Sequence, residues 1–176
     1  MQVYSSALEM IGRTPLLKIS KLDTGPCELF LKLEFLNPGG SIKDRIGVSM
    51  IEAAEQRGDL QPGGTIVEAT AGNTGLGLAL VAAQKGYRLI LVLPDKMSQE
   101  KIFNLRALGA EVVLTRSDVS KGHPEYYQDL GASIAQKIGG MKSSPMPSTS
   151  QAPLAVILPL FTYSARIEPR GSATIS

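Results

Sequence analysis

The sequence predicts an α/β fold of three layers, in which helices cover both faces of a largely parallel sheet. From about residue 5 to residue 140, short apolar runs alternate with stretches of helical periodicity. Clusters of glycine and proline, such as GDLQPGG at 58–64, separate these segments. Strands that alternate with helices in this way are typical of βαβ units, which build parallel sheets.

The predicted strands are short runs dominated by leucine, isoleucine, valine and phenylalanine. The run at 88–94 is apolar almost throughout, which indicates a strand buried on both faces. Turn residues flank several of these runs and limit their length. The five predicted strands are LLKI (16–19), ELFLKLEF (28–35), TIVEAT (65–70), RLILVLP (88–94) and EVVLT (111–115).

The first predicted helix covers residues 41–58. Ser41 can cap its start, and Asp44 three residues later resembles a capping box with aspartate in place of glutamate. Four apolar residues recur at a spacing of four and predict one buried stripe. They are Ile42, Ile46, Met50 and Ala54.

Three further helices are predicted by periodicity together with their end signals. Residues 73–86 end at Gly86, a common C-terminal cap. Residues 98–110 begin at Ser98, which can cap the first turn. Residues 124–140 open with Pro124 and close with glycines.

After residue 140 the composition changes. Residues 141–176 hold five of the 11 prolines of the chain but only one of its 16 acidic residues. The apolar stretch LAVILPLF (154–161) is interrupted by Pro159 and shows no useful periodicity. We therefore divide the chain into residues 1–140, a folded unit, and residues 141–176, a divergent Pro/Ser-rich tail that composition predicts to be disordered.

Composition also excludes several classes of function. No run approaches the roughly 20 apolar residues that span a membrane, and the N-terminus has no signal-peptide pattern. Cys27 is the only cysteine, which excludes an intrachain disulfide and disfavours a cysteine-based metal site. The net charge is +2 without a basic run, so no nucleic-acid partner is expected. These features favour a cytoplasmic protein.

The segment EATAGNTGLGLAL (68–80) places a glycine-rich turn between a strand and a helix. That arrangement presents free backbone N–H groups to an anion. The dinucleotide fingerprint is not met, because the glycine spacing is reversed, and the P-loop is not met, because no lysine closes the turn. Two interpretations remain: a turn of small residues that lets the helix pack on the sheet, or a cradle for a carboxylate or phosphate.

The segment NPGGSIKDRIG (37–47) places Lys43 in the first turn of a helix. The helix dipole and the neighbouring Arg45 both disfavour the charged form of this amine, and a neutral lysine amine is a nucleophile for carbonyl carbons. Taken alone, the residue is better explained as a solvated surface lysine, and the segment at 68–80, an anion-binding helix start that could face the same cleft, favours the reactive amine. Capping and surface pairing likewise explain Asp44 and Arg45, although both could belong to a cofactor site.

Together these two segments resemble the cofactor-lysine motif and the substrate loop of cysteine synthase and cystathionine β-synthase, which belong to the tryptophan-synthase-β-like, fold-type-II pyridoxal-phosphate enzymes. Three further segments resemble the same family in the same order, over about residues 5–140. They are IGRTPLLKI, KGYRLILVLPDKMSQEK and LRALGAEVVLTR. The resemblance implies an incomplete tryptophan-synthase-β-like fold, the N-terminal part of the catalytic unit.

The resemblance also implies roles for individual residues. Lys43 would hold pyridoxal 5'-phosphate covalently and act as the catalytic base, and Asn73 would bind the cofactor ring. Thr70, Ala71, Gly72, Asn73 and Thr74 would bind the carboxylate of the substrate. Ala71 departs from the family, which usually has serine there. No metal is implied.

The implied activity is β-replacement on serine or O-acetylserine by a thiol or sulfide, in cysteine or cystathionine biosynthesis. Such lyases and transferases are usually homodimers and act on small amino acids. Three expected elements are not found after residue 140: a Gln-Phe-x-Asn-Pro segment, a phosphate-binding Gly/Thr-rich loop, and a Ser/Thr for the pyridine nitrogen. We therefore expect impaired activity in this truncated chain, or alternatively a non-catalytic remnant or interaction fragment.

Overall fold

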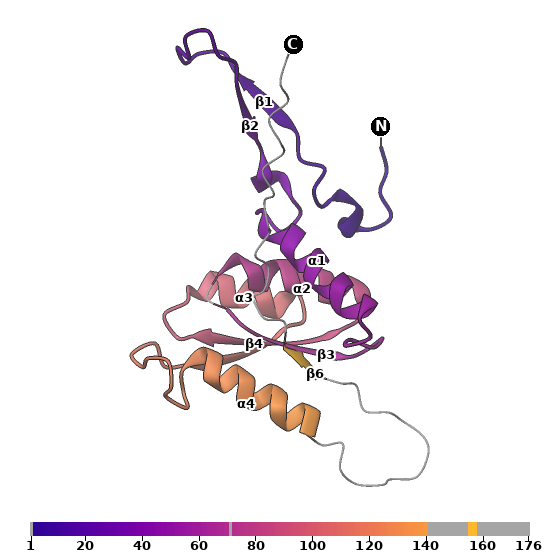
Figure 1. The fold of residues 1–176 in the computed structure, drawn as a ribbon, viewed down its shortest axis with the longest axis vertical. Helices are drawn as coiled ribbons and strands as arrows, with labels where there is room; N and C mark the ends of the chain where they lie inside the picture. The colour runs from indigo at the N-terminus through magenta and orange to yellow at the C-terminus, as the bar shows by residue number, and fades with distance from the viewer. Residues whose placement is uncertain (1, 71, 141–154, 158–176) are drawn as a thin grey trace, which may run out of the picture.

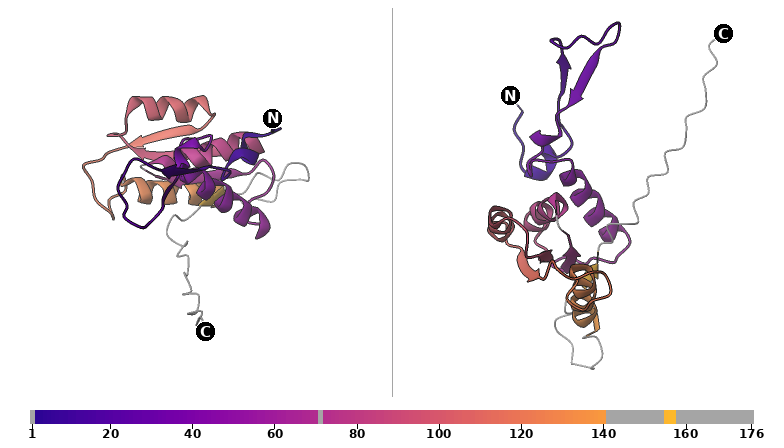
Figure 2. Two further views of the ribbon diagram at one scale, coloured as in Figure 1. Left: turned by 90° about the horizontal axis from the view of Figure 1, so that it is seen from above. Right: turned by 90° about the vertical axis from the view of Figure 1, so that its left-hand side faces the viewer.

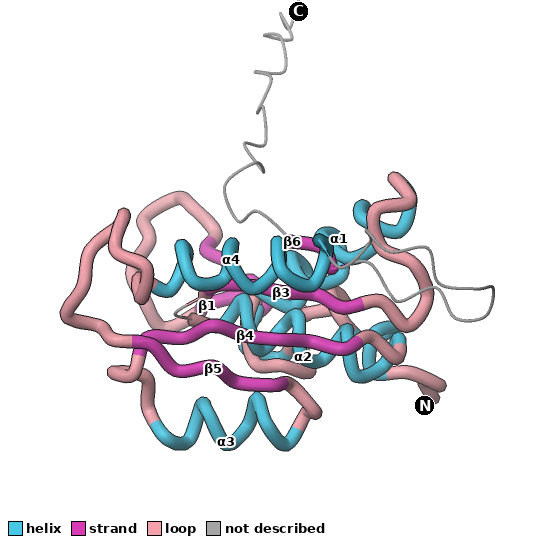
Figure 3. Tube along the Cα trace, turned by 90° about the horizontal axis from the view of Figure 1, so that it is seen from below, coloured by secondary structure: helices cyan, strands magenta, loops and turns pink. Residues whose placement is uncertain are grey.

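The computed structural model describes residues 2–70, 72–140 and 155–157. Its centre is a parallel sheet of four strands in the order β5-β4-β3-β6. The strands are β3 (Thr65–Ala69), β4 (Arg88–Pro94), β5 (Glu111–Thr115) and β6 (Ala155–Ile157). Figure 3 shows the strands side by side. The predicted α/β class and the parallel sheet are confirmed.

Helices cover both faces of this sheet (Figures 1 and 2). Three lie on one face: α1 (Lys43–Gln56), α2 (Asn73–Lys85) and α3 (Gln99–Ala107). The fourth, α4 (Tyr127–Gly140), lies on the other face. Gly86 ends α2 with a φ of 75°, and the Ser98 hydroxyl caps α3 by accepting from the Lys101 N–H, so both end signals are confirmed.

Alternating residues of the central strands build the two sides of the core. Val67 and Ile90, which are partners in register, pack with Ala135 of α4. Ile66 and Leu91 point to the opposite side and belong to the larger cluster with α1, α2 and α3. A strand buried on both faces needs apolar residues at every position, which is why β4 reads as one continuous apolar run.

The structure corrects two of the expected elements and adds one. The strand expected at 28–35 covers only Leu29–Lys32, and a 3-10 helix follows it at Glu34–Leu36. Helix α4 starts at Tyr127 rather than at Pro124, because the Tyr126 N–H bonds the His123 carbonyl in a turn. A further 3-10 helix at Ala7–Met10 was not predicted.

The buried face of α1 also differs from the predicted stripe. Ile42 is half exposed, whereas the buried residues of the helix recur at spacings of three and four. Of the four predicted members only Ala54 is fully buried, because the helix packs through small and polar positions that apolar periodicity does not count. The buried positions are Asp44, Gly47, Ile51 and Ala54.

Strand β6 lies within the segment that composition assigned to an irregular tail. Its three residues pair in parallel with β3, from Thr65↔Ala155 to Val67↔Ile157. No strand was predicted here. The boundary at residue 140 stays a prediction, as does the disorder expected for 141–154 and 158–176, which lie outside the described residues. Within the described part of the chain, no helix is both long enough and apolar enough to cross a membrane.

A two-stranded antiparallel hairpin projects from the side of the body that carries α1, α2 and α3 (Figures 1 and 2). It consists of β1 (Leu16–Ile19) and β2 (Leu29–Lys32). Register places Leu17 opposite Leu31 and Ile19 opposite Leu29, so one face of the hairpin is wholly aliphatic. Leu17 and Leu31 are nearly half exposed, and two strands alone are marginally stable in water.

We expect this aliphatic face to drive self-association of the purified chain at high concentration. Burying each exposed leucine contributes on the order of 1–2 kcal/mol, so the double variant Leu17→Thr/Leu31→Thr should weaken association about tenfold or more. Sedimentation velocity measures the effect. Leu114→Thr is the matched control, since Leu114 is a similarly exposed leucine on β5. An equal effect from the control would contradict the prediction.

Candidate active site

The site is organised by a close crossing of α1 and α2. Gly47 of α1 and Gly77 of α2 meet backbone to backbone: a Cβ added at Gly47 would lie 2.7 Å from the Gly77 carbonyl oxygen. A Cβ added at Gly77 would lie 2.6 Å from the Lys43 carbonyl oxygen. Real side chains do not approach so closely, so the crossing requires glycine at both positions. Glycine is therefore selected here for close approach rather than for an unusual backbone angle.

This crossing brings two of the predicted site residues toward each other. Residues four apart share a face of a helix. Lys43 therefore lies on the α2-facing side of α1, one turn before Gly47, and Asn73 lies on the α1-facing side of α2, one turn before Gly77. The Lys43 side chain is half buried and takes part in none of the ion pairs formed among the described residues.

The far ends of the same two helices are tied by ionic hydrogen bonds. Glu55, near the end of α1, accepts from the Lys85 ammonium and from the Tyr87 hydroxyl, each at 2.7 Å. Charge-assisted bonds of this length are among the stronger polar contacts. Burial and the neighbouring Glu55 raise the pKa of Tyr87 to about 12. The helix pair is therefore held at both ends, which limits how far the start of α1 can move relative to α2.

The first turn of α1 is organised differently from the predicted capping box. The helix begins at Lys43 itself, and the Ser41 hydroxyl accepts from the Lys43 N–H at 3.1 Å. The Asp44 carboxylate does not return to Ser41. Instead it accepts from the Gly39 N–H at 2.5 Å, because the loop folds back over it and leaves Asp44 with no exposed surface.

The Asp44 carboxylate is only partly satisfied. In the described part of the chain, its Oδ1 is the one buried side-chain polar atom left without a hydrogen-bond partner. Burial raises the pKa of Asp44, and the Gly39 N–H partly offsets that rise. Gly39 has no room for a side chain, since an added Cβ would lie 2.5 Å from this carboxylate oxygen. The loop before Lys43 is thus fixed against the helix that it precedes.

The predicted substrate loop forms the start of α2. Gly72 is the N-terminal cap in an extended conformation, and no side chain caps the first turn. The Thr70 hydroxyl accepts from the Gly72 N–H at 3.4 Å. Thr70 and Thr74 are buried, whereas Asn73 is exposed. An uncapped helix start of this kind has N–H groups that favour an anion.

The fifth member of the predicted loop, Ala71, lies outside the described residues. Its proposed contribution to the site therefore rests on the sequence. The structure brings Thr70, Gly72, Asn73 and Thr74 together at one turn, and joins Lys43 to that turn through the helix crossing.

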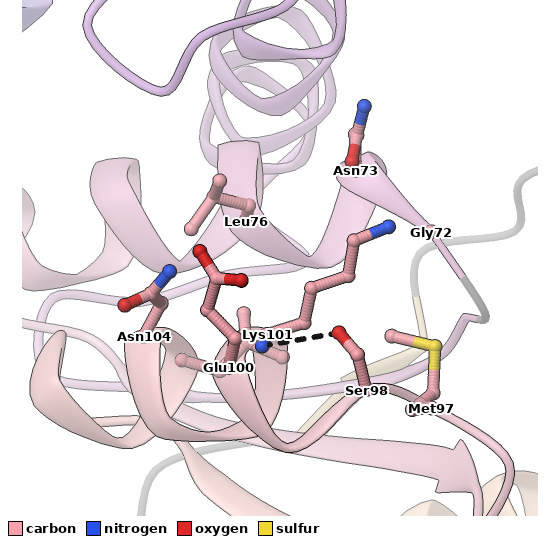
Figure 4. Close-up of a pocket in the computed structure, with 9 residues that line it drawn as sticks. Gly72, Asn73, Leu76, Met97, Ser98, Glu100, Lys101 and Asn104 are labelled. Atoms are coloured by element: carbon pink, nitrogen blue, oxygen red, sulfur yellow. Dashed lines mark hydrogen bonds between the residues drawn. The ribbon is translucent and has the colours of Figure 1, made fainter.

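A pocket of about 210 Å³ opens on the α3 side of this turn. Gly72 and Asn73 line one wall, and Ser98, Lys101 and other residues from the start of α3 line the opposite wall. Figure 4 shows the Lys101 side chain extending toward Gly72, while the Asn73 amide points away from the pocket. Lys43 does not line this pocket.

Two polar features of the site were not predicted from the sequence. Arg45 does not form a loose surface pair. Its guanidinium donates two hydrogen bonds of 2.9 Å to the Glu34 carboxylate. This contact holds the pKa of Glu34 down to about 2. The two partners are 11 positions apart in the sequence, and no local pattern predicts that they pair.

The second such feature is Glu68, near the end of β3. It is 3% exposed and lies opposite Leu91 in register, on the face covered by α1, α2 and α3. Burial raises the pKa of Glu68 to about 8, so the carboxyl is mostly protonated at neutral pH. The available signal was a single acid inside TIVEAT, a segment otherwise typical of a buried strand.

Comparison with known proteins gives a consistent result. A family model described as "Pyridoxal-phosphate dependent enzyme" matches residues 7–149. Cystathionine beta-synthase of Oryctolagus cuniculus is 49% identical over 140 residues, which are 78% of this chain and 25% of that protein. A cysteine synthase of a Flavobacterium species is 54% identical over 128 residues, 72% of this chain and 42% of that protein.

Solved structures agree. A hydrogen sulfide-producing enzyme from Fusobacterium nucleatum superposes with a TM-score of 0.70 at 36% identity, covering 89% of this chain and 46% of that one. The chain therefore spans between a quarter and a half of the length of these similar proteins.

We expect Gly77→Ala to displace the start of α1. The new methyl group would overlap the Lys43 carbonyl, which is backbone and cannot rotate away, so the cost is about 1–3 kcal/mol. Urea unfolding measures it. Gly139→Ala is the matched control, because Gly139 lies in α4 with open space around it and alanine favours helices. Equal stability of the two variants would contradict the prediction.

We also expect Glu68 to make folding stability depend on pH. Its pKa is raised from the ordinary 4.5 to about 8 on folding, so unfolding releases a proton between these values. Stability should therefore be highest near pH 5 and fall as pH rises toward 8. A tenfold change in an ionisation equilibrium corresponds to about 1.4 kcal/mol, so the decrease can reach several kcal/mol.

Urea midpoints of wild type and Glu68→Gln between pH 5 and pH 8 test this dependence. The variant should show a flatter profile, because its amide does not titrate. Glu52→Gln, at an exposed position on α1, should keep the wild-type slope. Parallel profiles for wild type and Glu68→Gln would refute the assignment.

Proposed function

Because this chain belongs to the family of pyridoxal-phosphate dependent enzymes, we propose that it provides the cofactor lysine and the carboxylate cradle of a β-replacing enzyme. The reaction exchanges the β-substituent of serine or O-acetylserine for a thiol or sulfide, in cysteine or cystathionine biosynthesis. The observation that carries the proposal is the Gly47–Gly77 crossing, which places Lys43 and Asn73 on facing sides of two helices.

The residues present fit the reactive end of the cofactor. Lys43 is half buried and has no ion pair among the described residues, so its amine is available to a carbonyl carbon. The uncapped start of α2 offers donors for an anionic oxygen beside it. When bound, pyridoxal phosphate supplies an electron sink for carbanion chemistry at the α-carbon of an amino acid.

The chain's own residues divide the remaining work. The Lys43 Nζ would hold the cofactor and, once the substrate amine has replaced it there, would accept and return the α-proton of the substrate as a general base and acid. The uncapped backbone N–H groups at the start of α2 bind the substrate carboxylate, with help from the hydroxyls of Thr70 and Thr74. The Asn73 side chain orients the cofactor ring. Carboxylate binding holds the α-carbon near Lys43, which lowers the entropic part of the barrier.

The same proposal sets limits on this polypeptide. The residues that the family resemblance assigns to the cofactor phosphate are not found in its 176 residues. Phosphate binding is a main electrostatic anchor, so we expect weak cofactor retention and low activity. A small amino acid and a thiol or sulfide are the proposed partners, and the cytoplasm is the proposed compartment. The second candidate function is a non-catalytic fragment that binds a longer relative.

Covalent labelling tests the assignment of Lys43. Purified chain is incubated with pyridoxal phosphate, reduced with borohydride and mapped by mass spectrometry. We expect the adduct predominantly at Lys43, because this amine sits at a positive helix start beside an anion cradle. Lys43→Met should abolish that adduct and most cofactor uptake.

Lys137→Met is the control, since Lys137 is an exposed helical lysine on α4. It should leave labelling of Lys43 unchanged. Labelling spread evenly over the surface lysines, with no preference for Lys43, would contradict the enzymatic proposal and favour the non-catalytic fragment.

A further inference from the structure

The base of the β1–β2 hairpin is joined to the first turn of α1 by one arginine. Arg45 donates through Nε to Glu34 Oε2 and through Nη2 to Glu34 Oε1, both at 2.9 Å. This paired geometry matches the flat fork of a guanidinium to a carboxylate and fixes orientation as well as distance. Glu34 opens the short 3-10 helix that leaves β2, so the pair links one strand of the hairpin directly to α1.

The same guanidinium also reaches the other strand. Its Nη2 donates to the Gly12 carbonyl at 2.9 Å and to the Thr14 hydroxyl at 3.2 Å, just before β1 begins. The Thr14 hydroxyl in turn donates to Glu34 Oε1 at 2.7 Å. Gly12 leaves room for this contact, because a Cβ there would lie 2.8 Å from Arg45 Nη1. Both strands are therefore attached at one point.

Asn37 completes the network from the loop that leads to Lys43. Its side-chain amide donates to the Glu34 carbonyl at 2.8 Å and to Glu34 Oε2 at 3.0 Å, and its Oδ1 accepts from the Gly12 N–H at 2.8 Å. Asn37 is 3% exposed and every polar atom of its side chain has a partner. A satisfied network of this kind is rigid, because any displacement leaves buried groups without partners.

The network holds the segment that carries the reactive amine. Lys43 stands between two fixed points: Asn37 and Gly39 in the preceding loop, and Arg45 two residues later. Ile42, the N-cap residue of α1, makes no side-chain cap, so the Ser41 hydroxyl that accepts from the Lys43 N–H is the one side chain of the helix start that bonds this turn. The first turn of a helix frays most easily when it is held only by its own backbone, so outside contacts decide where Lys43 sits.

We propose that Arg45 is a positioning residue for Lys43: through Glu34 it locks the first turn of α1 against the hairpin and thereby sets the direction of the Lys43 amine. The inference rests on the proposed role of Lys43. It makes the hairpin part of the site without contact to substrate, because a movement of the hairpin base is transmitted through the guanidinium to the lysine two residues away.

The ionic state of the pair suits this role. The Arg45 contact is the main cause of the low pKa of Glu34, followed by the Thr14 hydroxyl, and Asn37 adds a smaller contribution. Asp44, on the same turn, is the nearby acid affected by the Glu34 charge. The Arg45–Glu34 pair is therefore ionised throughout the neutral range, and its effect on Lys43 should not vary with pH between about 5 and 8.

The test compares wild type with Arg45→Met, Arg45→Lys and Glu34→Gln in the full chain. Two readouts are taken at a temperature where each protein is folded by circular dichroism: the rate of borohydride-trapped pyridoxal-phosphate adduct at Lys43, and the rate of Lys43 acetylation by limiting acetic anhydride. Each rate is divided by that of Lys137 in the same sample, which cancels general changes in reactivity.

We expect Arg45→Met and Glu34→Gln to lower the normalised adduct rate at Lys43 about tenfold or more, since displacements near 1 Å can cost a hundredfold in a positioned reaction. Arg45→Lys should recover part of the rate, because an ammonium restores the charge but not the fork. Arg116→Met is the control, since Arg116 forms a similar pair with Asp118 outside the hairpin and α1. It should leave Lys43 unchanged.

The outcomes separate the two proposals. Normalised rates at Lys43 within twofold of wild type in folded Arg45→Met and Glu34→Gln overturn the role of Arg45. If wild type takes no cofactor at Lys43, the proposed function fails, but the acetylation rates still test the role of Arg45. A changed acetylation rate of Lys43 in Arg45→Met then supports that role, and an unchanged rate overturns it. If Arg45→Met does not fold, the rates of Arg45→Lys and Glu34→Gln decide between the same two results.

Discussion

The contact on which the rest of the site depends is the backbone approach of Gly47 and Gly77. Two helices that carried side chains at this point would separate by the width of at least a methyl group. The start of α1, which carries Lys43, would then move away from the start of α2. The sheet below fixes α2 through the buried face that includes Leu78 and Val81. The glycine crossing transfers this fixed position to α1.

Among the described residues, charge is distributed so that Lys43 has no ion pair and the start of α2 has no side-chain cap. Two of the acids near the site are already satisfied or neutral: Glu34 is held by Arg45, and Glu68 is protonated by burial. A buried ionised carboxylate beside the start of α2 would compete with any anion placed there. Keeping Glu68 neutral therefore preserves the positive character of the helix start, at the cost of a stability that depends on pH.

The sequence predicts some parts of this arrangement well because their signals are local. Strands β1, β4 and β5 have the predicted bounds, since apolar runs end where turn residues or charges begin. The roles of Lys43 and of the turn after β3 stay predictions, drawn from motifs within single short segments. The stripe on α1 failed because Gly47 and Asp44 are buried for reasons that lie in α2 and in the preceding loop. Arg45 binds Gly12 across 33 residues, and no periodicity encodes such a contact.

The long-range contacts of Gly77 and Arg45 determine how the site responds to amino-acid substitutions. A lysine that reacts through a covalent bond must be held in direction as well as in position, and a helix start cannot supply direction alone because its first turn has few internal hydrogen bonds. If Lys43 has its proposed role, the chain supplies this direction from two sides, with Gly77 below the turn and the Arg45–Glu34 pair beside it. These constraints are physically different, one steric and one ionic. A substitution that weakens one leaves the other in place, so the amine can be misdirected while the fold persists, and reactivity is then the more sensitive measure of the two.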